Sequence, residues 1–99
     1  MSVEIHLHSH AEENLSEAFA HYENESPGLG EFFVECFEKV EMDLSEHPEM
    51  YQKIYGDIRR GLIKHFPYGV FYLYEHGEVL ILNVLNTRSD IESYLEENF

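Results

Sequence analysis

Three histidines alternate near the N-terminus, at His6, His8 and His10. Alternate side chains of a strand point to the same face, so on a strand this spacing would direct all three imidazoles to one side. Imidazole is a common ligand of zinc and nickel, and such a face could bind either metal. The residues that precede and alternate with the histidines are apolar, which is more typical of a strand with a polar side in solvent. We favour this second interpretation and expect no metal or other cofactor.

Basic residues gather in the second half of the chain, although 20 acidic and 6 basic residues give a formal net charge of −14. Residues 11–46 hold eleven acids and one base, whereas residues 50–88 hold three acids and five bases. The molecule is therefore predicted to be polarised, with the bases either binding a partner or offsetting nearby glutamates. Its overall acidity opposes direct binding of nucleic acid. The five bases are Lys53, Arg59, Arg60, Lys64 and Arg88.

The one cysteine, Cys36, lies between Phe33 and Phe37 on an apolar helical stripe, which is typical of a small core residue rather than a nucleophile. A single cysteine forms no internal disulfide, and the chain begins without a basic leader and apolar segment. The longest apolar run, Val79–Leu82, is far shorter than the roughly 20 residues of a membrane helix. We therefore expect a cytoplasmic protein with no membrane segment.

The elements that carry these residues follow from periodicity in a chain of 99 residues, the size of one domain. Residues 2–8 alternate apolar and polar side chains, which predicts a half-buried strand. The segment Ser9–Glu12 has capping-box spacing, and apolar residues then recur at helical spacing to about Asn24. Ser26–Pro27 predicts the N-cap and first residue of a second helix, which His47–Pro48 ends. Two helices so closely joined must pack as an antiparallel hairpin.

After Pro48, aromatic and β-branched residues without helical period predict an antiparallel sheet. His76–Gly77 suits a tight hairpin turn, and the apolar run Val79–Leu85 indicates a central strand covered on both faces. Ser89–Glu92 repeats the capping-box spacing and predicts a short closing helix. The strands are predicted at Met50–Tyr55, Ile58–His65, Tyr68–Tyr74 and Glu78–Leu85. Residues 1–99 are thus predicted to form one α+β domain: a strand, an antiparallel helical hairpin, a three- to four-stranded antiparallel sheet and a short C-terminal helix.

Several strings in this order are informative together. Ser26–Gly30 opens the second helix, Leu44–Pro48 closes it, and Ile58–Leu62 carries two arginines. The string Phe66–Tyr72 breaks the chain at a proline before an apolar strand, and Val79–Leu85 follows after the hairpin turn. These strings resemble the RelE/ParE toxin superfamily over roughly residues 9–95. The Phe-Pro-Tyr sequence resembles the ParE branch more closely than the RelE branch.

The resemblance implies a toxin of a type II toxin–antitoxin (plasmid stabilisation) module, kept inactive by an antitoxin whose extended tail wraps it. Proteins similar to ParE poison DNA gyrase by binding, whereas proteins similar to RelE cut messenger RNA on the ribosome without a metal. Arg88 and Tyr94 match the late arginine and C-terminal tyrosine of the family and are the candidate catalytic residues. Gly69 stands where a family arginine is expected, which removes one cation from a phosphate clamp.

We therefore expect a toxin that acts by binding rather than by catalysis, with a cognate antitoxin as its partner. Arg59, Arg60, Lys64 and Arg88 are the candidate target-binding residues. A ribosome-dependent endoribonuclease is the alternative. A diverged solitary copy that retains only partner binding is a third possibility, because toxins of this superfamily are usually basic. A homodimer is left open.

Overall fold

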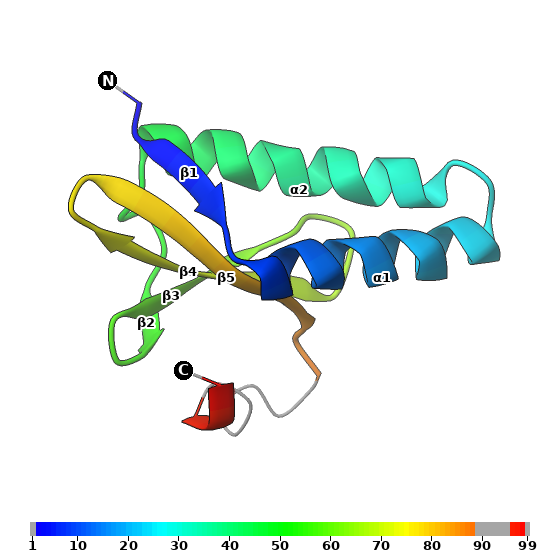
Figure 1. The fold of residues 1–99 in the computed structure, drawn as a ribbon. Coiled ribbons are helices and arrows are strands. Elements are labelled where there is room, and N and C mark those ends of the chain that lie inside the picture. The colour runs from blue at the N-terminus through cyan, green and yellow to red at the C-terminus, as the bar shows by residue number, and fades with distance from the viewer. Residues whose placement is uncertain (1, 89–95, 99) are drawn as a thin grey trace.

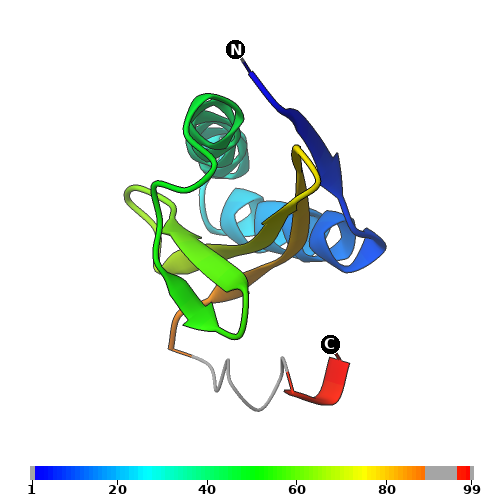
Figure 2. The same cartoon turned by 90° about the vertical axis from the view of Figure 1, so that its left-hand side faces the viewer.

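Two helices pack on one face of a five-stranded sheet in the computed structural model, which describes residues 2–88 and 96–98 (Figures 1 and 2). The strand order is β1-β5-β4-β3-β2, in which β1 runs parallel to β5 and the other neighbours are antiparallel. The predicted α+β order of strand, helical hairpin and antiparallel strands is confirmed. The elements are β1 (Glu4–Leu7), α1 (Ser9–Glu25), α2 (Leu29–Glu46), β2 (Lys53–Tyr55), β3 (Ile58–Leu62), β4 (Tyr68–Glu75) and β5 (Glu78–Asn86).

The caps of both helices differ from the predicted ones. α1 is capped by His8, whose Nδ1 accepts a hydrogen bond from the backbone N–H of His10 at 3.0 Å, so Ser9 is already helical. α2 begins after Gly28, which takes a left-handed conformation with φ of 88°. The predicted N-cap at Ser26 is therefore wrong. The Glu23 carboxylate of α1 accepts hydrogen bonds from the backbone N–H groups of Gly28 and Gly30, both at 3.0 Å, and so replaces a local cap.

Two strands are shorter than predicted. β2 begins at Lys53 rather than Met50, and the preceding carbonyls of Glu49 and Tyr51 accept hydrogen bonds from the Arg59 guanidinium. β3 ends at Leu62 rather than at His65, because His65 has a left-handed φ of 72° that a strand cannot include. The predicted closing helix at 89–95 lies outside the described residues, and residues 96–98 are helical.

The core lies between the helices and one face of the sheet, and β5 is central to it. β5 buries Val79 and Ile81 against the helices and Leu82 on the opposite face, which confirms the predicted two-sided burial. β4 and β5 are joined through His76 and Gly77, both with positive φ, as expected for a tight hairpin turn. The buried residues of the helix-side core are Ala11, Ala18, Phe33, Phe37, Val40, Leu44, Ile63, Val70, Tyr72, Val79, Ile81 and Val84.

The hydroxyl of Tyr72, a residue of this core, ties the sheet to the chain just after α2. The Tyr72 side chain is 0% exposed, and its hydroxyl donates a hydrogen bond to the Pro48 carbonyl at 2.8 Å. We expect Tyr72→Phe to lower the free energy of unfolding by about 1 kcal/mol, since the partly buried Pro48 carbonyl loses its donor. Urea denaturation measures this, with Tyr74→Phe as the control. Equal stability of Tyr72→Phe and the wild type would contradict the assigned role of the hydroxyl.

The same residue links stability to alkaline pH. Burial raises the pKa of Tyr72 above its usual value of about 10. Below the pKa of an unfolded tyrosine, the hydroxyl is neutral in both states, so this residue leaves the free energy of unfolding unaffected by pH. As the pH rises from there through the pKa of the folded state, the free energy of unfolding falls, because the tyrosine ionises more readily in the unfolded chain. The Tyr72→Phe variant should therefore lose less stability than the wild type above about pH 10.

Candidate functional site

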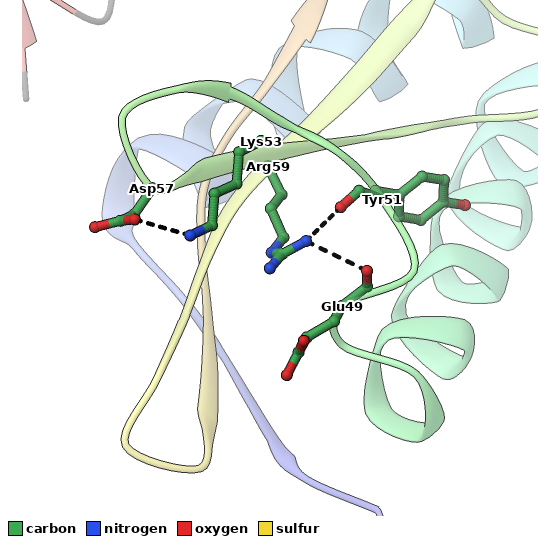
Figure 3. A network of polar contacts seen from close by, with 5 residues as sticks. All are labelled: Glu49, Tyr51, Lys53, Asp57 and Arg59. Atoms are coloured by element: carbon green, nitrogen blue, oxygen red, sulfur yellow. Dashed lines mark hydrogen bonds and ion pairs between the residues drawn. The ribbon is translucent and has the colours of Figure 1, made fainter.

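Arg59 and Arg60 are neighbours on β3, and the strand directs them to opposite faces of the sheet. Arg59 lies on the helix side, where its Nη1 donates hydrogen bonds to the carbonyls of Tyr51 at 2.6 Å and Glu49 at 3.3 Å (Figure 3). Lys53 forms an exposed ion pair with Asp57 at 3.0 Å in the same region (Figure 3). Arg59 thus holds the connection between α2 and β2, and its predicted role in target binding stays a prediction.

Arg60 lies on the sheet face that points away from the helices. Its Cγ and Cδ lie 3.1 Å from the point where a Cβ on Gly69 would be, so the aliphatic stem of Arg60 covers position 69 of the adjacent strand. Gly69 is therefore the residue that makes room for Arg60. Position 69 of β4, where the resemblance leads us to expect an arginine, is a glycine. The side chain of Arg60 on β3 lies over this position.

A shallow groove of about 240 Å³ surrounds Arg60 at the edge formed by β2 and β3. Met50 and Leu62 line it and are 49% and 55% exposed, so both present apolar surface at this edge. Ile54 of β2 also lines the groove and is half-buried. We call Met50, Ile54, Arg60 and Leu62 the sheet patch. It combines one cation with exposed apolar surface, a composition typical of protein-binding sites.

None of the other predicted cations lines the groove around Arg60, although Leu62 lines both that groove and the cavity of Lys64. Lys64 lines a cavity of about 500 Å³ against α2, together with Cys36 and Lys39. Arg88 is exposed after β5, and its charge partly opposes the burial that raises the pKa of Tyr22 on α1. Tyr94 lies outside the described residues, so the Arg88 and Tyr94 pair is not described. Arg59, Arg60 and Lys64 line three different cavities and do not form one phosphate clamp.

A second groove runs between the two helices. It has a volume of about 450 Å³, and no Lys or Arg is among the described residues that line it. Burial, and to a smaller extent the neighbouring Glu38 carboxylate, raises the pKa of Glu41 above its usual value. Its apolar floor consists of Leu7, Leu15, Phe19, Val34 and Phe37, and its acidic rim consists of Glu12, Glu38 and Glu41. We call these eight residues the hairpin groove. The eleven acids in residues 11–46 predicted that the helices would be negatively charged. They did not predict that some of these acids would line an apolar groove.

Comparison with known proteins decides the family. The model of the family described as "ParE toxin of type II toxin-antitoxin system, parDE" matches residues 5–91. The chain belongs to the ParE toxin family. A solved structure described as "Chromosomal ParDE TA system from P. aeruginosa" contains a chain of similar fold, with a TM-score of 0.76 and 13% identity. The match covers 86% of the present chain and 96% of that one. No curated protein sequence matches significantly.

Membership in the ParE toxin family confirms the predicted resemblance and gives the chain a type II toxin role. It also favours the ParE branch, which the Phe66–Tyr72 string indicated. None of the helices in the described part of this ParE-family chain combines the length and apolar character needed to cross a membrane.

The histidines of this ParE-family chain do not form the single face that their spacing would allow. His8 caps α1, and its ring centroid lies 4.5 Å from that of His10. His6 lies instead between two carboxylates, with Nε2 3.2 Å from Glu4 and 3.8 Å from Glu78. Glu4, His6 and Glu78 are exposed, their ligand atoms lie within 4.8 Å of one another, and together they form a group that could hold a metal ion. Sequence spacing missed Glu78, which the parallel pairing of β1 with β5 brings in.

Cys36 is half-buried and packs against the helix-side core, as predicted. Burial raises the pKa of its thiol above the usual value, with a smaller contribution from the Glu35 carboxylate. A raised pKa leaves less thiolate at neutral pH and so a weaker nucleophile. The geometry thus supports a packing role.

Proposed function

We propose that this ParE-family chain is a cytoplasmic toxin that binds its cellular target through the sheet patch and is neutralised by a cognate antitoxin. DNA gyrase is the target that the resemblance to ParE implies. The observation that carries the proposal is the position of Arg60, beside the exposed Met50 and Leu62 and over Gly69. Arginine surrounded by apolar contacts is a frequent source of binding energy in protein interfaces.

The charge distribution supports binding through the sheet rather than through the helices. The body of the protein is strongly acidic and would be repelled by DNA held on gyrase. Residues 50–88 are the exception, with five bases and three acids. A polarised molecule of this kind approaches an anionic partner with its less acidic side first. The sheet patch belongs to that side.

Binding also fits the dispersed cations better than catalysis does. Cleavage of RNA without a metal needs several cationic groups arranged around one phosphate. The described cations of the predicted site line separate cavities or, in the case of Arg88, stand exposed after β5. The sheet patch, in contrast, already presents a continuous surface with exposed apolar side chains.

The test is inducible expression of the full chain without its neighbouring gene, followed by a supercoiling assay with purified gyrase. We expect growth arrest with filamentation and damaged DNA, and inhibition of supercoiling by the purified chain. Normal growth with soluble protein accumulating would indicate the diverged, non-toxic copy. Rapid loss of translation with cut messages, and no effect on gyrase, would replace the proposal with ribonuclease action.

Ribosome-dependent cleavage by Arg88 and Tyr94 is the second candidate, because the Arg60 stem over Gly69 returns one cation near the place of the missing arginine. The cation comes from a different strand, and loss of one preorganised charge commonly lowers a rate about 100- to 1000-fold. We expect no detectable cleavage in a ribosome assay, and no change on Arg88→Ala or Tyr94→Phe. Cleavage that disappears in Arg88→Ala would make the enzyme the leading interpretation.

A further inference from the structure

We propose that Glu4, His6 and Glu78 form a binding site for a divalent transition-metal ion such as Zn²⁺. Glu4 and His6 lie on β1, and Glu78 begins β5. The two strands run side by side in the same direction, and their parallel pairing places Glu4 directly opposite Glu78 (Figure 1). Alternate residues of a strand share a face, so His6 lies on the same face as Glu4. We call these three residues the edge site.

The distances within the edge site suit one small cation. The Nε2 atom of His6 lies 3.2 Å from Oε2 of Glu4 and 3.8 Å from Oε1 of Glu78. Three ligand atoms, one from each residue, lie within 4.8 Å of one another. Zinc binds imidazole nitrogen and carboxylate oxygen at about 2.0 to 2.2 Å, which places two ligands of a tetrahedral site about 3.4 Å apart. Small rotations of the exposed carboxylates are therefore enough to bring all three atoms onto one ion.

The edge site also gathers negative charge that a cation would balance. A neutral imidazole has a single N–H, and the 3.8 Å between His6 and Glu78 is longer than a hydrogen bond. Glu75 pairs with Glu78 across the β4 and β5 hairpin and adds a third carboxylate nearby. Within residues 2–88 and 96–98, neither Lys nor Arg forms an ion pair with Glu4, Glu75 or Glu78. A divalent ion would bind the nitrogen lone pair and offset the repulsion between the carboxylates.

The surroundings leave room for the remaining ligands of a metal. The edge site lies on the sheet face that points away from the helices, because Ile5 and Val79, which alternate with its residues, pack in the helix-side core. A cavity of about 420 Å³ opens beside His6 and Glu78. Water in this cavity would complete the coordination, as it does in zinc sites with three protein ligands.

The donor set favours a transition metal over magnesium or calcium. One imidazole nitrogen with two carboxylate oxygens suits zinc and its neighbours, whereas magnesium and calcium prefer oxygen ligands only. The edge site is not the three-histidine face that spacing alone would allow, because His8 caps α1. A carboxylate from β5 takes part instead.

The experiment measures zinc binding by the untagged full chain, after treatment with EDTA and dialysis into a buffer that does not chelate metals. We expect calorimetry to show saturable binding of one zinc ion per chain. Zinc should also raise Tm, because an ion that binds only the folded chain stabilises it. An excess of Mg²⁺ of about 100-fold should not displace the zinc. Binding that does not saturate, an unchanged Tm, or displacement by Mg²⁺ would overturn the proposal.

Matched variants separate the edge site from general attraction to histidines and acids. Glu78→Gln removes a carboxylate beside His6, and Glu25→Gln makes the same change beside His21, whose Nε2 lies 3.5 Å from Glu25. The side chains of Glu78 and Glu25 are equally exposed, at 55%. We expect Glu78→Gln to bind zinc at least about 10-fold more weakly, since even outer-shell partners of a metal contribute this much. Glu25→Gln should lose less than about 2-fold. Equal losses would show attraction to net charge only and would overturn the proposal.

His6→Gln tests the nitrogen ligand in the same way. We expect a loss of at least about 10-fold, and no rise in Tm with zinc when His6→Gln is combined with Glu78→Gln. Circular dichroism checks that each variant is folded. If His6→Gln binds weakly and Glu78→Gln binds as the wild type does, the alternating histidines and not the pairing of β1 with β5 hold the metal, which would overturn the proposal. Both measurements are independent of the cellular target.

Discussion

An Arg60→Glu variant is expected to lose inhibition of the target by about 100-fold or more, with the fold intact. Truncating an interface arginine at the centre of apolar contacts commonly costs about 2 kcal/mol or more, and reversing its charge adds repulsion. The aliphatic stem of Arg60 lies over Gly69, and glutamate is too short to cover the same surface. The measurement is the concentration of purified protein that half-inhibits gyrase supercoiling.

Lys39→Glu provides the control for this change, since it makes the same charge reversal on α2, at a residue that does not line the groove around Arg60. We expect it to inhibit gyrase as the wild type does. If both variants lose inhibition equally, overall charge governs the interaction and the sheet patch has no special role. If Arg60→Glu remains fully active, the target surface lies elsewhere.

An Asn14→Leu variant is expected to lose about 3 kcal/mol of unfolding free energy, which for a chain of this size lowers Tm by about 15 °C. The Asn14 side chain on α1 reaches the irregular part of β5, where its Oδ1 accepts two hydrogen bonds. One comes from the Asn83 amide at 2.9 Å and the other from the Val84 backbone N–H at 3.0 Å. Asn83 is 0% exposed, and leucine would remove the acceptor from two buried donors.

Asn14→Asp is the matched control, because aspartate keeps an oxygen at the same position. It should be more stable than Asn14→Leu when both are unfolded by heat or urea. The opposite order would mean that the packing of α1 on β5 depends on side-chain volume rather than on this shared acceptor.

Local patterns were sufficient for most of the elements. α2 ends at Glu46 immediately before the predicted stop at His47–Pro48, because proline restricts the residue before it. The turn at His76–Gly77 and the two-sided burial of Val79–Leu85 also follow from residue type along a short stretch. The helix caps did not follow, since Glu23 caps α2 from the preceding helix and no nearby serine is needed.

The candidate site was predicted only in its residue types. Arg60 was named from its sequence neighbours, but the approach of its stem to Gly69 depends on the register of β3 with β4. The same register pairs the neighbouring Arg59 with Tyr72 on the helix side of the sheet, where Arg59 donates hydrogen bonds to backbone carbonyls. Both grooves likewise combine residues from separate elements, so neither has a signature in any single stretch of the chain.

The sequence by itself determined the α+β order, the helical hairpin and the acidic character of residues 11–46, because periodicity, turn residues and charge act over short distances. The tertiary structure alone decided that β1 joins β5 in parallel and brings Glu4 and His6 beside Glu78. It also decided that Arg59, Arg60 and Lys64 line separate cavities and that three of the acids, Glu12, Glu38 and Glu41, line an apolar groove. These outcomes depend on contacts between residues far apart in the chain, which local patterns do not encode.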